Sequence, residues 1–315
     1  MPVYESIADL VGNTPIVDVS QLSPNPRVRI LAKLEGWNPG GSVKDRAARW
    51  MLDEAEKDGS LKPGAVILES SSGNTGIALA MFSKMRGYPF KVVLPENVSL
   101  ERKQLLDVWG AEIIWSPAAE GSNGAMLRAK KLAEENPDWF YTYQYGNPSN
   151  PKAHYESTGP EIWRDVPEIT HFIAGLGTAG TIIGVGTFLK ERNPNIEIWA
   201  IEPPVGEMVD GLKNFDEGFV PPVFVDGHGA ELLSRKMIVR PRESIEWVRR
   251  FTEVGVFAGI SSGSIMAGAA KAAMEIDEGT IVMIVCDGGW KYLSAGVWTD
   301  DLDVVEERAK KTLYF

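Results

Sequence analysis

A lysine at the predicted start of a helix is the first residue whose position suggests chemistry. In the stretch KLEGWNPGGSVKDR, residues 33–46, a glycine turn leads to Ser42 and then to Lys44. A cation at a helix N-terminus meets the positive end of the helix dipole, which costs up to about 1 kcal/mol and favours the neutral amine. A neutral amine can attack an aldehyde, so Lys44 is a candidate for a Schiff base with pyridoxal 5′-phosphate. A solvated surface lysine is the alternative.

The stretch GLGTAGT, residues 175–181, lies between a strand pattern and a helix pattern, which is typical of phosphate binding. Its three glycines match the dinucleotide fingerprint G-x-G-x-x-G, and Glu202 supplies an acidic residue about 20 positions further on. The hydroxyls of Thr178 and Thr181, beside the backbone N–H groups, favour one compact phosphate instead. A glycine turn without a ligand stays open at this point.

The stretch SSSGNTG, residues 70–76, also follows a predicted strand and opens a helix. The hydroxyls of Ser71, Ser72 and Thr75, together with the N–H groups of the helix start, are suited to a carboxylate. The amide of Asn74 is suited to an oxygen atom of a cofactor ring. An ordinary helix cap is the alternative.

The stretch GISSG, residues 259–263, matches the G-x-S-x-G elbow of serine hydrolases. That fold needs a histidine after the serine, but His154, His171 and His228 all precede it. The elbow is therefore not expected to be a hydrolase site, and serines that cap a helix are the alternative. The three histidines also lack the paired spacing of a metal site, so no metal is predicted.

Short β-branched runs alternate with helical patterns along the chain, which indicates an α/β fold with parallel sheets covered by helices. Strands are predicted at 65–70, 91–95, 111–116, 139–143, 171–175, 196–203 and 280–287. The segment 144–154, rich in Asn, Pro and Gly, is predicted to separate two α/β units. Ligands are expected in the cleft between them, at the carboxyl ends of the strands.

Composition narrows the class of protein further. The chain has 315 residues and a formal net charge of −11, with no basic cluster of the kind that binds nucleic acid. No apolar run approaches the roughly 20 residues of a membrane span, and the N-terminus lacks a leader pattern, so a cytoplasmic protein is expected. The single cysteine, Cys286, lies in a strand pattern and is predicted to be a buried thiol.

The chain resembles the fold type II pyridoxal-phosphate enzymes, and among them the cysteine synthases, over nearly its whole length. The matching motifs, in order, are GNTPIV (12–17), KLEGWNPGGSVKDR, SSSGNTG, QYGNP, GLGTAGT, EGFVP (217–221) and FAGISSG (257–263). The resemblance implies two parallel-type α/β domains with the cofactor in the cleft between them. It implies a smaller mobile domain, 37–148, with the carboxylate loop, and a larger domain, 1–36 and 149–315, that binds the cofactor phosphate.

The resemblance also implies roles for single residues. Lys44 would carry the cofactor, Asn74 would meet its ring hydroxyl, Gly177, Thr178, Ala179, Gly180 and Thr181 would hold its phosphate, and Ser261 would meet the pyridine nitrogen. Ser71, Ser72, Thr75 and Gln144 would hold the substrate carboxylate, although many relatives carry threonine where this chain has Ser71. A serine hydroxyl leaves the ring nitrogen unprotonated, which suits β-elimination better than transamination.

The activity implied is β-replacement of a β-substituted serine by a sulfur nucleophile through an α-aminoacrylate intermediate, with Lys44 as the general base. The smaller domain would close on the substrate and exclude water. A serine or threonine dehydratase is the second hypothesis and a dinucleotide-dependent oxidoreductase the third. A non-catalytic scaffold is disfavoured because Lys44 and Asn74 are both present.

The stretch GLKNFDEGFVP, residues 211–221, bears on the leaving group, because it resembles cysteine synthase B-like enzymes that accept O-phosphoserine. Those relatives carry arginine where this chain has Lys213, so the cation persists but its bidentate fork is lost. O-phosphoserine is favoured over O-acetylserine, and an exposed surface lysine is the alternative for Lys213.

The resemblance implies partners as well as a substrate. It implies a homodimer and a sulfur donor, either sulfide or a thiocarboxylated carrier protein. The C-terminal stretch ERAKKTLYF is a candidate cover for the site, with an ordinary terminal helix as the alternative.

Overall fold

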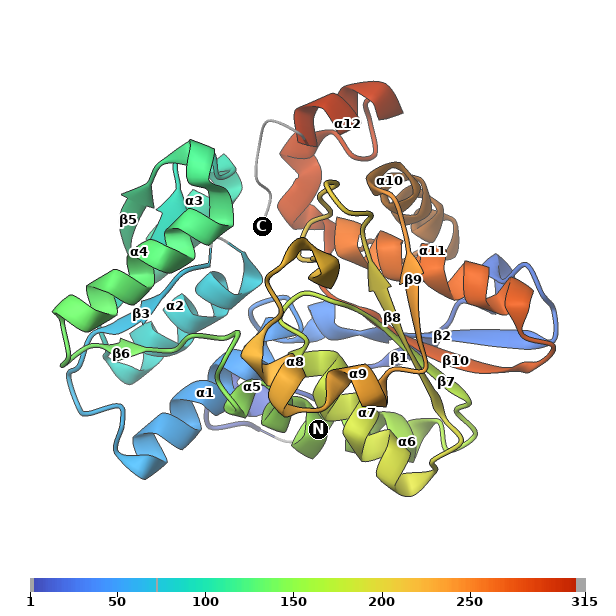
Figure 1. Cartoon of the computed structure of the whole chain (residues 1–315), viewed down its shortest axis with the longest axis horizontal. Coiled ribbons are helices and arrows are strands. Elements are labelled where there is room, and N and C mark those ends of the chain that lie inside the picture. The colour runs from blue at the N-terminus through green and yellow to red at the C-terminus, as the bar shows by residue number, and fades with distance from the viewer. Residues whose placement is uncertain (1–2, 72, 310–315) are drawn as a thin grey trace.

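Two β-sheets with helices packed on them form the protein, as a computed structural model of residues 3–71 and 73–309 shows (Figure 1). The larger sheet has the order β1-β2-β10-β7-β8-β9, and only β1 runs antiparallel to its neighbour. Its strands are β1 (Ile16–Asp18), β2 (Val28–Leu34), β7 (His171–Gly175), β8 (Glu197–Glu202), β9 (Arg235–Ile238) and β10 (Gly279–Val285).

The smaller sheet is entirely parallel and has the order β5-β4-β3-β6. Its strands are β3 (Ile67–Glu69), β4 (Phe90–Pro95), β5 (Glu112–Ser116) and β6 (Phe140–Tyr141). The predicted α/β fold with parallel sheets is therefore confirmed. The division of the chain into domains at residues 37–148 stays a prediction.

The described helices include the three that the sequence predicted to begin near Lys44, Asn74 and Gly180. In chain order, the α-helices are α1 (Lys44–Asp58), α2 (Asn74–Arg86), α3 (Leu100–Trp109), α4 (Gly121–Glu135), α5 (Ser149–Ala153), α6 (Gly159–Asp165), α7 (Gly180–Arg192), α8 (Pro222–Asp226), α9 (Gly229–Leu232), α10 (Pro241–Arg250), α11 (Ile260–Glu275) and α12 (Leu302–Ala309). Part of the segment 144–154, expected to be a linker, is helical because α5 occupies its end. None of the described helices is both long and apolar enough to cross a membrane.

Strand alternation explains how each sheet is covered on both faces, because successive side chains of a strand point to opposite sides. Ile67 packs in a core with α1 and α2, whereas its neighbour Leu68 packs against α4. Met283 of β10 lies in a core with α11, whereas Val282 lies in a core with α7. Figure 1 shows α10 and α11 on one side of the larger sheet and α6 and α7 on the other.

Three strands were missed by the sequence analysis. The strand β2 carries Lys33 in its second half, and this fully buried lysine interrupts the apolar run that would have indicated a central strand. The short edge strand β9 begins with Arg235 and Lys236, both exposed, and charged residues are common on exposed edges. The strand β1 has only three residues.

A buried ion cluster joins α1 to the larger sheet. The guanidinium of Arg46, on α1, lies 2.7 Å from a carboxylate oxygen of Glu35, which follows β2, and 2.7 Å from one of Glu161, on α6. Lys33 of β2 lies 2.7 Å from the same Glu161 oxygen. Thr14 completes the cluster, because its hydroxyl donates to Glu35 at 2.6 Å.

The charges of this cluster compensate one another. Burial acts to raise the pKa of Glu35, but the Arg46 guanidinium and the Lys33 ammonium outweigh burial and lower that pKa to about 2. The stabilisation from Glu35 is therefore complete above its ordinary pKa of 4.5 and is lost as the pH falls from there toward 2. Arg46 stands two residues after Lys44, the first residue of α1. The cluster therefore also fixes the position of Lys44 relative to the larger sheet.

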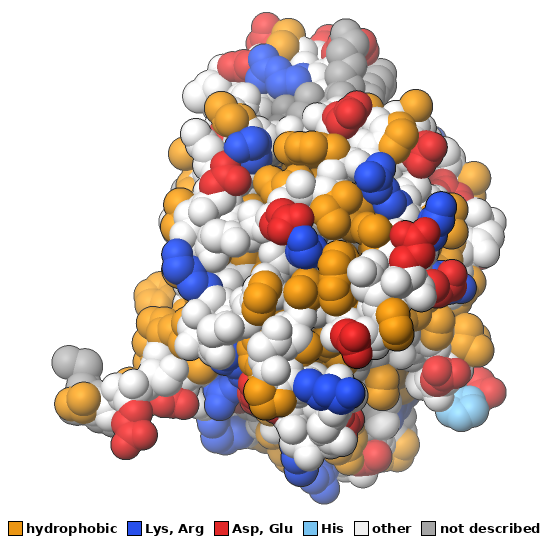
Figure 2. Space-filling model, turned by 90° about the vertical axis from the view of Figure 1, so that its left-hand side faces the viewer, with side chains coloured by type: hydrophobic (Ala, Val, Ile, Leu, Met, Phe, Trp, Pro, Cys, Tyr) orange, Lys and Arg blue, Asp and Glu red, His pale blue; other side chains and the backbone are white. Residues whose placement is uncertain are grey.

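Basic and acidic side chains are interspersed with hydrophobic ones on the face of the molecule that Figure 2 shows. That face does not present a broad area of one sign. This face is therefore not expected to steer an anionic ligand over a long range.

Replacing the buried arginine tests the cluster. Arg46→Met is expected to lower the free energy of unfolding by about 3 to 5 kcal/mol, because it leaves buried carboxylates without their main partner. The control, Arg29→Met, removes an arginine that is half exposed and paired with Asp18 and Glu168, and is expected to cost less than about 1 kcal/mol. Urea unfolding at pH 7 measures both values. Similar small losses for the two variants would contradict the structural role of the cluster.

Candidate active site

A cavity lies where strands of both sheets end. Its walls come from the segments that follow β3, β6, β7, β8 and β10, so every parallel strand involved presents its carboxyl end to it. The predicted residues that line it are Lys44, Ser71, Asn74, Thr75, Gln144, Gly177, Thr178, Ala179, Thr181, Lys213 and Ser261. Gly180 stands beside this wall as the first residue of α7, and Ser72 lies outside the described residues.

Lys44 is the first residue of α1, as predicted, and is half-buried in the cavity wall. The turn before it is tied to the end of β10, because the N–H of Val43 donates to the carbonyl of Cys286 at 2.8 Å. Burial lowers the pKa of the Lys44 amine, although the thiol of Cys286 and the carboxylate of Asp287 act in the opposite direction. Burial thus shifts the Lys44 amine toward the neutral form, in the direction that the sequence predicted.

The loop between β7 and α7 forms a cradle with unused backbone donors. Within the described part of the chain, the N–H groups of Gly177, Thr178 and Ala179 have no hydrogen-bond acceptor. Ala179 has a left-handed backbone with φ of +67°, which is uncommon for a residue with a side chain. A Cβ atom on Gly177 would lie 2.3 Å from the carbonyl oxygen of Gly211, so only glycine fits there. Orphan donors at a helix N-terminus suit an anionic oxygen, and a phosphate group fits this loop.

Two side chains behind the loop orient its hydroxyls. The amide of Asn150 donates one hydrogen to the carbonyl of Gln144 at 2.9 Å and the other to the hydroxyl oxygen of Thr178 at 3.1 Å. The Thr178 hydroxyl therefore keeps its own hydrogen for a ligand. The hydroxyl of Thr181 lies 3.2 Å from Nε2 of His154, and burial lowers the pKa of His154 to about 3, so this histidine is neutral.

Glu202, the acidic residue of the dinucleotide alternative, does not face the cavity. Its side chain is 1% exposed and pairs with Lys236 at 2.8 Å. It also accepts from the backbone N–H of Phe215 at 3.4 Å. Glu202 is therefore not available to a ribose hydroxyl.

The loop after β3 and the loop after β6 meet at the other end of the cavity. The hydroxyl of Thr75 donates to Oε1 of Gln144 at 2.6 Å, which leaves the amide nitrogen of Gln144 free to donate to a ligand. The fully buried Glu69 holds these loops, because it accepts from the N–H groups of Ser70 at 2.7 Å and Gln144 at 3.1 Å. Burial raises the pKa of Glu69, while its hydrogen bonds act to lower it. Glu69, which lies within the predicted strand 65–70 and ends β3, was not anticipated as a site residue.

Ser261 lies in the first turn of α11 and lines the cavity, but it does not cap the helix. The N-cap is Gly259, so the interpretation of the two serines as caps is wrong. Ser262 instead accepts the N–H of Cys286 at 2.9 Å. Cys286 itself is half-buried in the cavity wall, so it is less enclosed than the predicted core thiol, and burial raises its pKa to about 11.

Lys213 reaches the cavity from the loop after β8. Its ammonium lies 4.9 Å from the ring centre of Tyr145 and 5.1 Å from that of Phe219. Its backbone N–H donates to the carbonyl of Leu176 at 2.7 Å, which ties this loop to the phosphate cradle. Burial lowers the pKa of Lys213, and Glu217 acts to raise it. The interpretation as an ordinary exposed surface lysine is therefore wrong.

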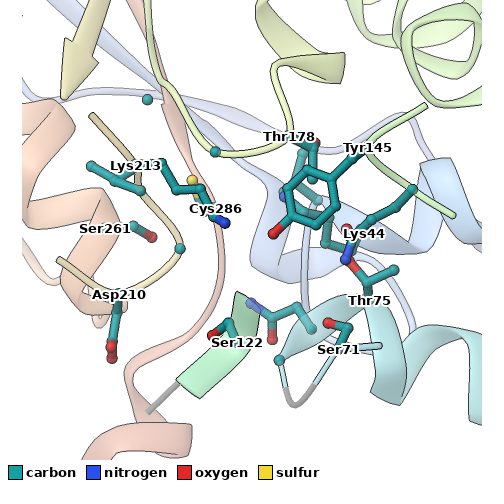
Figure 3. Close-up of a pocket in the computed structure, with 18 of the residues that line it drawn as sticks. Lys44, Ser71, Thr75, Ser122, Tyr145, Thr178, Asp210, Lys213, Ser261 and Cys286 are labelled. Atoms are coloured by element: carbon teal, nitrogen blue, oxygen red, sulfur yellow. Dashed lines mark hydrogen bonds between the residues drawn. The ribbon is translucent and has the colours of Figure 1, made fainter. Parts of the chain in front are cut away.

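The cavity residues that were not anticipated from the sequence include Arg102, Asp210 and Tyr292. Arg102, on α3, is 1% exposed, and its guanidinium lies 5.8 Å from the ring centre of Tyr292. Asp210 is 8% exposed, and its Oδ2 atom has no hydrogen-bond partner in the described part of the chain. In Figure 3, Asp210 and Lys213 lie on the left of the cavity and Lys44 on the right. No motif or spacing distinguishes Arg102, Asp210 and Tyr292 in the sequence, so only the fold reveals them.

No group of three or more side chains of the kinds that bind metal ions is found among the described residues. The side chains that line the cavity supply amines, hydroxyls, amides, a guanidinium, a thiol and a carboxyl group, with an anion cradle at one side. This donor set fits a cofactor that carries both an aldehyde and a phosphate.

Comparison with known proteins agrees with this fit. The family model described as "Pyridoxal-phosphate dependent enzyme" matches residues 7–287. The chain belongs to this family. It is 40% identical over 297 residues to cysteine synthase B of Pseudomonas aeruginosa, covering 94% of this chain and 98% of that protein. It is 39% identical over 298 residues to cysteine synthase B of Escherichia coli, covering 94% and 97%.

Solved structures give the same assignment. O-ureido-L-serine synthase superposes with a TM-score of 0.88 at 36% identity, covering 94% of this chain and 96% of that one. The cysteine synthase of Entamoeba histolytica superposes with a TM-score of 0.88 at 33% identity, covering 98% and 96%. The predicted fold type, the cofactor class and the resemblance to cysteine synthases are confirmed. When bound, pyridoxal phosphate acts as an electron sink for the carbon atoms of an attached amino acid.

Proposed function

We propose that the protein is a cysteine synthase that replaces the β-substituent of O-phosphoserine with a sulfur nucleophile. The choice of O-phosphoserine rests on the position of Lys213, a cation that lines the same cavity as Lys44. The cavity thus holds an amine for the cofactor and a separate cation for the substrate phosphate. In the reaction the bond from Cβ to the phosphate oxygen breaks, phosphate leaves with the electron pair, and a bond from Cβ to sulfur forms.

The proposed roles of the side chains follow from their donors. The amine of Lys44 takes the proton from the substrate α-carbon and later returns it, for which a lowered pKa is suitable. The free amide nitrogen of Gln144, with the hydroxyls of Ser71 and Thr75, binds the substrate carboxylate. Ser261 donates its hydroxyl hydrogen to the ring nitrogen of the cofactor. The loop of Gly177, Thr178, Ala179, Gly180 and Thr181 binds the cofactor phosphate.

O-acetylserine is the alternative substrate, and a dehydratase that releases pyruvate and ammonia without a thiol is the alternative reaction. O-ureido-L-serine synthase, by its name, makes a product other than cysteine.

Partners belong to the same proposal. We predict a homodimer and a cytoplasmic location. We also predict that the sulfur donor is either sulfide or a thiocarboxylated carrier protein. The candidate cover ERAKKTLYF runs from residue 307 to 315, and positions 310–315 of it lie outside the described residues.

Removing the charge of Lys213 tests the choice of substrate. Lys213→Met keeps the aliphatic stem and is expected to lower kcat/KM for O-phosphoserine about 10- to 100-fold, because a charge-assisted contact is lost. The same variant should change kcat/KM for O-acetylserine by less than about threefold, and Lys213→Arg should retain most phosphoserine turnover. Steady-state assays of cysteine formation measure these values. Equal losses with the two substrates would contradict the role of Lys213.

The carboxyl group of Asp210 is expected to make kcat/KM for O-phosphoserine depend on pH. Burial raises the pKa of Asp210 to about 7, with Arg102 acting to lower it and Asp287 to raise it. As the pH rises through 7 the group becomes anionic and repels a phosphate dianion in the cavity. Asp210→Asn is therefore expected to raise kcat/KM for O-phosphoserine about three- to tenfold at pH 8 and to change it little at pH 6.

The comparison of variant with wild type at one pH removes the titration of the substrate itself, whose phosphate has a second pKa near 6. O-acetylserine, which lacks the phosphate, serves as the control substrate. An equal gain at pH 6 and pH 8, or no gain at either, would show that the charge of Asp210 does not act on the substrate.

A further inference from the structure

The side-chain amide of Asn74, the first residue of α2, is held between two opposite charges. Its Nδ2 atom donates to Oδ2 of Asp287 at 2.8 Å. Its Oδ1 atom accepts from the ammonium of Lys291 at 2.5 Å. Asp287 and Lys291 are each 1% exposed, so solvent competes little for either contact.

These two contacts determine which end of the amide carries the oxygen. An ammonium group only donates hydrogen bonds and a carboxylate only accepts them. If the amide of Asn74 were reversed, its N–H bonds would face the ammonium of Lys291 and its carbonyl would face the carboxylate of Asp287. An asparagine between two hydroxyl groups would have no such preference, because a hydroxyl can either donate or accept a hydrogen bond.

The two charged residues are themselves anchored next to Lys44. Lys291 also donates to the carbonyl of Gly41 at 3.2 Å, in the turn that leads to Lys44. The hydroxyl of Tyr292 donates to Oδ2 of Asp287 at 2.9 Å. The segment 287–292 thus connects the turn before α1 with the start of α2.

We propose that Lys291 and Asp287 are positioning residues that orient Asn74 toward the ring oxygen of the cofactor. The Nδ2 atom has two hydrogens, and the contact with Asp287 uses one of them. The second hydrogen remains for an acceptor in the cavity, which Asn74 lines. A deprotonated ring oxygen is such an acceptor, whereas a reversed Asn74 would present a carbonyl to it. The inference rests on the proposed cofactor contact of Asn74 and does not depend on which serine derivative is the substrate.

A double-mutant cycle on cofactor affinity tests this inference. The dissociation constant of pyridoxal phosphate is measured by fluorescence titration of the apoprotein for wild type, Lys291→Met, Asn74→Ala and the double variant. Lys291→Met is expected to weaken binding about tenfold in the wild-type background, a change of about 1.4 kcal/mol. In the Asn74→Ala background the same substitution should weaken binding less than about twofold, because the amide that Lys291 orients is absent.

Two further variants complete the design. Lys291→Arg keeps a donor at the same place and should bind the cofactor within about threefold of wild type, with the wild-type visible absorption maximum. Lys131→Met removes a lysine that is 75% exposed on α4 and should leave affinity unchanged. If Lys291→Met does not fold, Asp287→Asn enters the same cycle and should show the same dependence on Asn74.

A loss that is equally large with and without Asn74 would overturn the inference, because Lys291 would then act independently of the amide. Failure of the wild-type apoprotein to bind pyridoxal phosphate at all is a different result, and it would count against the proposed function. Circular dichroism of each apoprotein separates loss of affinity from loss of structure.

Discussion

The buried pairing of Arg46 with Glu35 and Glu161 is the constraint on which the rest of the site depends. It joins the first turn of α1 to the end of β2 and to α6, across the region where the two sheets meet. Breaking such a pair leaves a buried charge without compensation, which is costly, so the start of α1 has little freedom to shift. Lys44 is two residues away and is held in the cavity wall as a result.

The same logic extends to the other walls of the cavity. Glu69 holds the loops that carry Ser71 and Gln144, and Asn150 orients the hydroxyl of Thr178. Each of these buried groups forms hydrogen bonds with the surrounding protein. A neighbouring donor therefore stays available for a ligand. The site is therefore preorganised: its donors are fixed before a cofactor or substrate arrives.

Much of the fold and of the cavity could be predicted from the sequence, because the informative residues stand at strand ends and helix starts. Lys44, Asn74 and the loop before α7 all lie where a strand or turn gives way to a helix, and the fold brings these positions together. The strand β2 could not be predicted, since its buried Lys33 pairs with Glu161, 128 positions further along the chain.

Several residues in and around the cavity could not be predicted, because their roles depend on the fold. Arg102 is one of several charged residues in an amphipathic helix, and nothing local distinguishes the one that turns inward. Asp287 and Lys291 are singled out by their hydrogen bonds with the side chain of Asn74, which stands more than 200 positions earlier in the chain. Asp287 is the last residue of the predicted strand 280–287, and ligands gather at the carboxyl ends of parallel strands, so that rule alone could have singled it out.

The most informative measurement is the visible absorption spectrum of the protein with bound pyridoxal phosphate, titrated separately with O-phosphoserine and O-acetylserine. We expect a visible cofactor band that Lys44→Ala shifts, and a spectral change at lower concentrations of O-phosphoserine than of O-acetylserine. The reverse order would contradict the assignment of substrate. A colourless protein that added pyridoxal phosphate leaves unchanged would contradict both the proposed cofactor site and the proposed reaction.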